Sequence, residues 1–108
     1  MQGRDDAKEK LGKKLTNWSG NATLGMKNIR ALLGTLHTVL WEGAKWKQQS
    51  LADVVQAKRV RLSYRKAIRI CHPDRHQNAP PEQKYIAERV FEALNAAYKI
   101  FEESELNK

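Results

Sequence analysis

The sequence is poor in the residues that cross-link, break or turn a chain. Its 108 residues include one cysteine, three prolines and six glycines. A single cysteine excludes a disulfide framework and a zinc site built from cysteines, and it is typical of a protein from a reducing compartment. Neither Asn-Gly nor Asp-Gly occurs, and runs of β-branched residues are few, so β-hairpins are not predicted. We therefore expect an all-α fold.

Long apolar runs are missing as well. No stretch of about 18 apolar residues occurs, which excludes a transmembrane helix at the level of sequence. Residues 1–10 are polar and mixed in charge, unlike a secretory signal. The length suits one small domain, so we expect a soluble, cytoplasmic, monomeric domain or a fragment of a longer protein.

Basic residues outnumber acidic ones, and the surplus is concentrated. The net charge is +8, from 20 Lys and Arg against 12 Asp and Glu. Residues 57–80 alone carry seven Lys or Arg and a single acid, whereas residues 81–108 carry more acids than bases. Such a surplus indicates nucleic acid, an anionic membrane or an acidic protein surface as partner. It directs the search for function to residues 57–80.

Apolar residues recur at spacings of three and four in three segments. The pattern predicts helices over residues 28–41, 58–71 and 81–103. We expect Gly43 to cap the first helix, Pro73 to end the second, and Pro80-Pro81 to begin the third. The last two helices, joined by a loop at residues 72–80, predict an antiparallel hairpin inside a small helical bundle.

Two weaker signals flank the first of these helices. Residues 5–18 predict a leader helix with too little apolar surface to stand alone, which we expect to dock through Trp18. Residues 50–53 read as a capping box for one short turn, with Leu51, Val54 and Val55 expected to point inward. We therefore divide the chain into a leader helix and linker at 1–23 and a helical domain at 24–108.

The basic helix carries its cations in one line. Lys58, Arg61, Arg65 and Arg69 recur at helical spacing and form a stripe on one side. The stripe is either a solvated face, partly neutralised by Glu88 or Glu92 across the hairpin, or a docking surface for an acidic partner. The motif that follows favours docking.

His72-Pro73-Asp74-Arg75 comes directly after the basic helix. Pro73 stiffens the tip of the hairpin and presents His72 and Asp74 outward. Asp74 is the one acid of residues 57–80, at a place where an incoming Arg or Lys can form a charge-assisted hydrogen bond.

Together these residues resemble a J-domain. Tyr64-Arg65-Lys66 in a basic helix, His72-Pro73-Asp74-Arg75 and a long closing helix are the features of these co-chaperones, which stimulate ATP hydrolysis by the 70-kDa heat-shock chaperones. The resemblance implies a chaperone-contacting set that comprises Lys58, Arg61, Tyr64, Arg65, Lys66, Arg69, His72, Pro73, Asp74 and Arg75. It also implies that the chain is no enzyme but the activator of a partner ATPase.

The resemblance extends to the auxilin and cyclin-G-associated-kinase group. Residues 28–41, Trp46-Lys47, residues 51–55 and the closing helix with Phe91 and Leu94-Asn95 are similar to that group. It implies recruitment of the chaperone to clathrin coats. Arg75 stands where auxilins more often have Lys, which keeps the charge. Asp-Leu-Leu clathrin motifs are absent, so clathrin contact would come from this surface or from an upstream region.

Other readings of the same residues are weaker. Cys71, His72 and His76 suggest a metal site, but Pro73 breaks the helix between them and no fourth ligand is apparent, so we predict no metal and no cofactor. The sequence lacks a phosphate-binding loop and a catalytic triad pattern.

Two alternatives to the clathrin role stay open. A basic helical domain that binds nucleic acid is disfavoured, because the turn at residues 72–80 is too long for a helix-turn-helix and the basic helix lacks Asn or Gln for reading adenine. The other alternative is a J-domain with a client other than clathrin.

Overall fold

The computed structural model describes residues 2–20 and 27–106, and within these ranges the chain is helical without any strand. The α-helices are α1 (Gln2–Ser19), α2 (Ile29–Thr35), α3 (Ala57–Cys71) and α4 (Pro81–Phe101). Short 3-10 turns follow at η1 (Leu36–Thr38), η2 (Ala52–Val54) and η3 (Pro73–His76), and a π-helical turn, η4 (Glu102–Leu106), extends α4. The all-α prediction is confirmed. None of the helices described here combines the length and the apolar character that a bilayer span requires.

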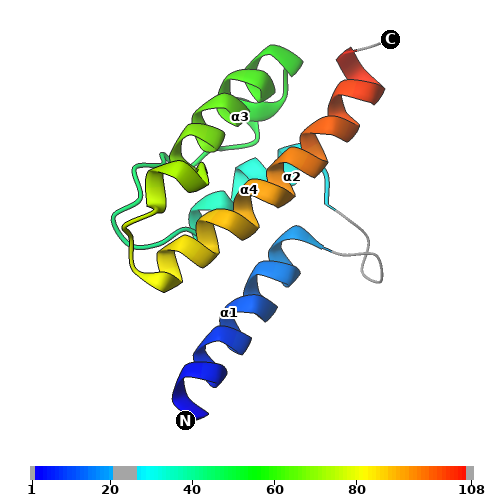
Figure 1. Cartoon of the computed structure of the whole chain (residues 1–108). Helices are drawn as coiled ribbons and strands as arrows, with labels where there is room; N and C mark the ends of the chain where they lie inside the picture. The colour runs from blue at the N-terminus through cyan, green and yellow to red at the C-terminus, as the bar shows by residue number, and fades with distance from the viewer. Residues whose placement is uncertain (1, 21–26, 107–108) are drawn as a thin grey trace.

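An antiparallel pair of helices forms the frame of the molecule. Figure 1 shows α3 and α4 side by side, joined by η3, with α2 packed behind them and α1 along the opposite flank of α4. The core between them consists of leucine, isoleucine, valine and alanine side chains, chiefly Leu32, Leu33, Leu36, Val60, Ala67, Val90 and Leu94. The predicted hairpin is therefore present, and η3 forms the tip at which its two helices are joined.

Prolines set the ends of the hairpin helices, as predicted. α3 ends at Cys71, because Pro73 pushes His72 into an extended conformation with ψ 128°. α4 begins at Pro81, whose missing N–H has no role in a first helical turn, and Glu82 lies in that turn near the positive end of the helix dipole.

α2 is shorter than the sequence suggested. The apolar period runs to residue 41, but the α-helix ends at Thr35, where the backbone turns to φ −117° and ψ 7°. The Thr35 hydroxyl donates to the Ala31 carbonyl, four residues back, at 2.7 Å. Gly34 before it is a poor helix former, and Thr in this position competes with the helix ladder. Leu36 and Val39 still reach the core from η1 and beyond. Gly43, expected as the helix cap, instead occupies a later turn with φ 89°.

The connector between α2 and α3 is partly as predicted. The capping box at residues 50–53 is present: the Asp53 carboxylate accepts from the Ser50 amide at 2.8 Å, which lowers the pKa of Asp53. Val54 is buried, whereas Leu51 and Val55 are 79% and 61% exposed, so the inward prediction is wrong for these two. A single 3-10 turn presents only one residue to the core, and its neighbours face solvent.

The leader helix docks as expected. Trp18 is buried, and its Nε1 donates to Thr35 Oγ1 at 3.0 Å. Arg89 on α4 donates to Thr16 at 3.0 Å. A Cβ at Gly12 would lie 3.1 Å from the Tyr85 hydroxyl, so the helices approach closely here. α1 is therefore packed on the half of α4 that follows the hairpin tip, away from α3.

Arg30 ties the other end of α4 to the connector. Its guanidinium donates to both carboxylate oxygens of Glu105, at 2.6 and 3.0 Å, and to the carbonyls of Val54 and Val55, at 2.9 and 3.0 Å. The pairing with Glu105 raises the pKa of Arg30. One side chain thus joins α2, the turn η2 and η4, far from the hairpin tip.

Candidate functional site

The predicted stripe lies on the solvent face of α3. Lys58, Arg61, Arg65 and Arg69 are all exposed, while Val60, Ala67 and Cys71 bury the opposite side of the same helix. Among the described side chains, no carboxylate lies within 4 Å of these four cations. Neutralisation by an ion pair with Glu88 or Glu92 is therefore not observed. The stripe presents unpaired positive charge to any partner.

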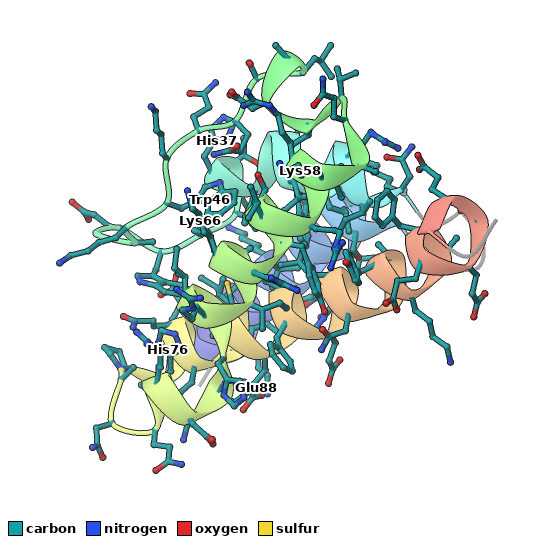
Figure 2. All side chains as sticks on the ribbon, turned by 90° about the horizontal axis from the view of Figure 1, so that it is seen from above. His37, Trp46, Lys58, Lys66, His76 and Glu88 are labelled. Carbon is teal, nitrogen blue, oxygen red and sulfur yellow. The ribbon has the colours of Figure 1, made fainter. Side chains whose placement is uncertain are left out.

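Lys66 lies apart from the stripe. It lines a separate groove of about 210 Å³ with Lys47, Gln49, Asp53, Arg59, Leu62 and Ser63, on the side of α3 that faces the connector. Figure 2 labels Lys66 on the side of α3 that faces the connector. The J-domain resemblance placed Lys66 in the chaperone-contacting set beside Arg65, but adjacent residues on a helix point about 100° apart, so Lys66 lies on another side of α3 from the stripe.

The stripe leads into an open hollow of about 390 Å³ at the hairpin tip. Its lining consists of Tyr64, Arg65, Ile68, Arg69, His72, Asp74 and Arg75. Six of the predicted site residues therefore meet in one place, with Pro73 between two of them. Lys58 and Arg61 belong to the same face but lie nearer the start of α3.

Short-range hydrogen bonds shape the tip. His72 Nδ1 accepts from the Asp74 amide at 3.1 Å, and the His72 carbonyl accepts from the Arg75 amide at 3.0 Å. The Asp74 side chain stays 79% exposed, with Oδ2 3.7 Å from His72 Nδ1. The turn thus satisfies its own backbone and leaves the Asp74 carboxylate open to solvent.

Three side chains of α4 contact the inner side of the hollow's lining residues His72 and Tyr64. Phe91 meets the His72 ring edge-on with centroids 5.2 Å apart. Tyr98 stacks on Tyr64 at 3.8 Å, and Asn95 accepts a hydrogen bond from the Tyr64 hydroxyl. Partial burial raises the pKa of Tyr64. Their supporting role was not predicted, although their spacing of four and three residues places them in one line along α4.

Cys71 and His76, considered above as metal ligands, face the interior. The Cys71 thiol is buried, and burial raises its pKa to about 12. His76 is 6% exposed, and both of its ring nitrogens are already bonded to protein groups. The described residues contain no group of three His, Cys, Asp or Glu side chains arranged to hold a metal ion. His37 is exposed on the surface, and Trp41 and Trp46 pack against the core as connector anchors.

Comparison with known proteins gives several relatives, although no family model matches. The chain is 42% identical over 100 residues to the J domain-containing protein required for chloroplast accumulation response 1 of Arabidopsis thaliana, covering 89% of this chain. It is 47% identical over 81 residues to Auxilin-related protein 1 of the same plant, covering 73% of this chain. It is 33% identical over 94 residues to the Auxilin-like clathrin uncoating factor SWA2 of Saccharomyces cerevisiae, covering 86% of this chain.

The structure and the relatives indicate the same family. The structure has the helical hairpin with His72-Pro73-Asp74 at its tip, and the relatives are J-domain and auxilin-like proteins. The chain belongs to the J-domain proteins. Within that family its relatives include auxilin-related and auxilin-like proteins. It spans 15%, 9% and 14% of the lengths of the three relatives described above.

Proposed function

We propose that this chain is a J-domain co-chaperone that binds a 70-kDa heat-shock chaperone in its ATP-bound form and stimulates its ATP hydrolysis. The chain itself performs no chemistry. It binds one conformation of the partner ATPase more tightly than the other, and so shifts the partner toward the state that hydrolyses ATP.

The stripe supports the approach to the partner. Four exposed cations, which have no carboxylate partner among the described side chains, create a positive potential along one face of α3. Such a potential accelerates encounter with an acidic surface and fixes orientation. Because the stripe runs into the hollow at the tip, a partner attracted by it arrives with its surface over His72 and Asp74.

The observation that carries the proposal is the placement of Asp74. It is the one acid of residues 57–80, it stands at the end of the cationic stripe, and its carboxylate is exposed. A turn bonded to His72 fixes its backbone. A basic group of the partner can therefore reach the carboxylate and form a charge-assisted hydrogen bond.

Single-turnover ATP hydrolysis by a chaperone loaded with ATP tests this role. Asp74→Asn keeps the shape and the backbone bond to His72 but removes the charge. We expect stimulation to require about ten- to hundredfold more of the variant, as for loss of a charged hydrogen bond. Glu103→Gln, an exposed acid on η4, is the matched control and should behave as wild type. Equal stimulation by Asp74→Asn and wild type would contradict the proposal.

We propose clathrin coats as the client. Support comes from the similarity to the yeast protein named as a clathrin uncoating factor. The plant relative named for the chloroplast accumulation response keeps another client open. Incubation of assembled clathrin cages with chaperone, ATP and this chain tests the client. We expect clathrin to be released from the sedimenting cages. Intact cages in the presence of a stimulated chaperone would favour another client.

The proposed J-domain comprises residues 24–108, with residues 1–23 as an appended leader helix and linker. The boundary itself lies outside the described residues. We propose that the domain acts as a monomer in the cytoplasm or on clathrin-coated vesicles. Sedimentation equilibrium at increasing concentration should give the mass of one chain throughout, and localisation of a tagged chain tests the second point.

A further inference from the structure

His76 is a polar side chain inside the apolar core, two residues after the exposed Asp74. Its side chain belongs to the last residue of η3 and is 6% exposed. It does not line the hollow at the tip. Its burial beside an exposed turn therefore needs another explanation than contact with a partner.

Both nitrogens of the His76 ring are engaged. Nε2 lies 2.6 Å from the carbonyl oxygen of Ile70, and Nδ1 lies 3.0 Å from Nε2 of Gln83. A carbonyl oxygen only accepts, so His76 Nε2 carries the hydrogen and donates it. Nδ1 then has no hydrogen and accepts from the Gln83 amide. These two bonds select one tautomer of the neutral ring.

The bond to Ile70 completes the end of α3. In a longer helix the Ile70 carbonyl would accept from the amide four residues on, which is that of Asp74. The Asp74 amide instead donates to His72 Nδ1. His76 Nε2 replaces it as the donor to Ile70. The imidazole thus caps the helix and frees the Asp74 amide for the turn that orients His72.

The same ring joins the tip to two other elements. Gln83 lies in the first turn of α4, and Trp41 of the connector packs edge-on against His76 with centroids 4.7 Å apart. Figure 2 shows His76 at the tip end of the hairpin, between the end of α3 and the start of α4. The end of α3, the start of α4 and the connector therefore meet at one side chain.

We propose that His76 is a positioning residue for docking, which holds the turn at residues 72–75 in the arrangement that the chaperone binds. This inference rests on the proposed function. His76 makes no contact with the partner. By fixing the path of the turn before binding, it raises the fraction of molecules whose His72 and Asp74 are correctly placed, and apparent affinity follows that fraction.

His76→Leu removes both hydrogen bonds and replaces the imidazole with an apolar side chain of similar size. The concentration that half-saturates stimulation should rise about three- to tenfold, as expected for loss of such bonds. Maximal stimulation should be kept, and so should the salt dependence, because no charge is removed. His76→Gln can still donate to Ile70 and should recover most of the affinity. His37→Leu, an exposed histidine on η1, is the matched control and should equal wild type.

The half-saturating concentrations of the variants decide the proposal. If His76→Leu half-saturates stimulation at the same concentration as wild type, the proposal is wrong. It is also wrong if His76→Gln needs as high a concentration as His76→Leu. If His76→Leu fails to fold, Gln83→Leu decides: its removal of the Nδ1 partner should raise half-saturation about threefold, and no change overturns the proposal.

A measurement on the free protein separates this inference from the proposed function. Hydrogen exchange of the Asp74 and Arg75 amides should accelerate about three- to tenfold in His76→Leu, beyond any change in global stability, which the amide of Val90 in mid-α4 reports. Should wild type fail to stimulate any chaperone, the proposed function fails, and this exchange still tests the hold of His76 on the turn. Equal exchange at the tip in both proteins overturns it.

Discussion

The Tyr64 ring lies flat on the Tyr98 ring, with centroids 3.8 Å apart and an interplanar angle of 4°. The Tyr64 hydroxyl also donates to Asn95 Oδ1. The same residue forms one wall of the hollow beside Arg65. Tyr64 therefore acts first as part of the seam between α3 and α4, and its exposed edge belongs to the proposed docking surface.

Tyr64→Phe separates these two roles. The stack with Tyr98 is kept, and the hydrogen bond to Asn95 is lost, so unfolding free energy should fall by about 1 kcal/mol. Stimulation of the chaperone should change less than twofold, because the hollow keeps its aromatic wall. Urea denaturation and the ATPase assay measure the two effects. Tyr64→Ala, which removes the wall, should impair both, and full activity of this variant would contradict a docking role for the ring.

The stripe predicts a salt-dependent contribution that differs along α3. Arg61 lies outside the hollow, so Arg61→Ala should lower the association rate about two- to fivefold at low salt and very little at high salt. Arg65 lines the hollow, so the association rate of Arg65→Ala should stay below that of wild type even at high salt. Binding kinetics at two ionic strengths measure this. Lys99→Ala, an exposed cation on α4, is the control, and a salt-independent loss for Arg61→Ala would contradict steering.

The hairpin could be predicted from sequence because its signals are local. Pro73 and Pro81 set helix ends through their own rings, and the apolar period of α3 and α4 identifies the faces that pack. The cationic stripe follows from helical spacing, and the exposed Asp74 follows from its place after Pro73 at the hairpin tip.

Features that depend on distant partners could not be predicted. The shortening of α2 at Thr35 arises from a residue that bonds both Ala31 and Trp18. The burial of His76 depends on Gln83 in the next helix and on Trp41, which packs on it from a remote part of the chain. Lys66 shares the helix of the stripe, and only the course of the connector shows that it lines a different groove.

The leader helix should stabilise the fold through its buried side chains, of which Trp18 is the largest. Trp18→Ala should lower the unfolding free energy by about 3–5 kcal/mol, because a 5% exposed indole leaves a cavity between α1 and the bundle. Trp18→Phe keeps most of the packing and loses the bond to Thr35, so about 1 kcal/mol is expected for that bond. Asn17→Ala, exposed on the same helix, is the control in urea denaturation. A Trp18→Ala protein as stable as the control would show that α1 does not dock.

The Cys71 thiol should make stability fall at alkaline pH. Burial raises its pKa to about 12 in the folded protein, whereas an unfolded cysteine has a pKa of about 8.5. The unfolded state therefore loses its proton first. The contribution of the thiol to stability is full below about pH 8.5 and is lost as the pH rises toward the folded pKa. Between those limits the slope approaches about 1.4 kcal/mol per pH unit.

Urea denaturation at several pH values from 7.5 to 10 measures this slope, and comparison with Cys71→Ala at each pH removes the contribution of the tyrosines, about half of which are ionised at pH 10 in the unfolded chain. Cys71→Ala is the reference: it should be less stable than wild type at pH 7.5, and the difference should shrink toward pH 10. Reaction of the folded wild type with a thiol reagent at pH 8 should be slow and should accelerate on unfolding, because the buried thiol stays protonated. Parallel stability curves for the two proteins, together with fast labelling of the folded chain, would show that Cys71 is not sealed in the core.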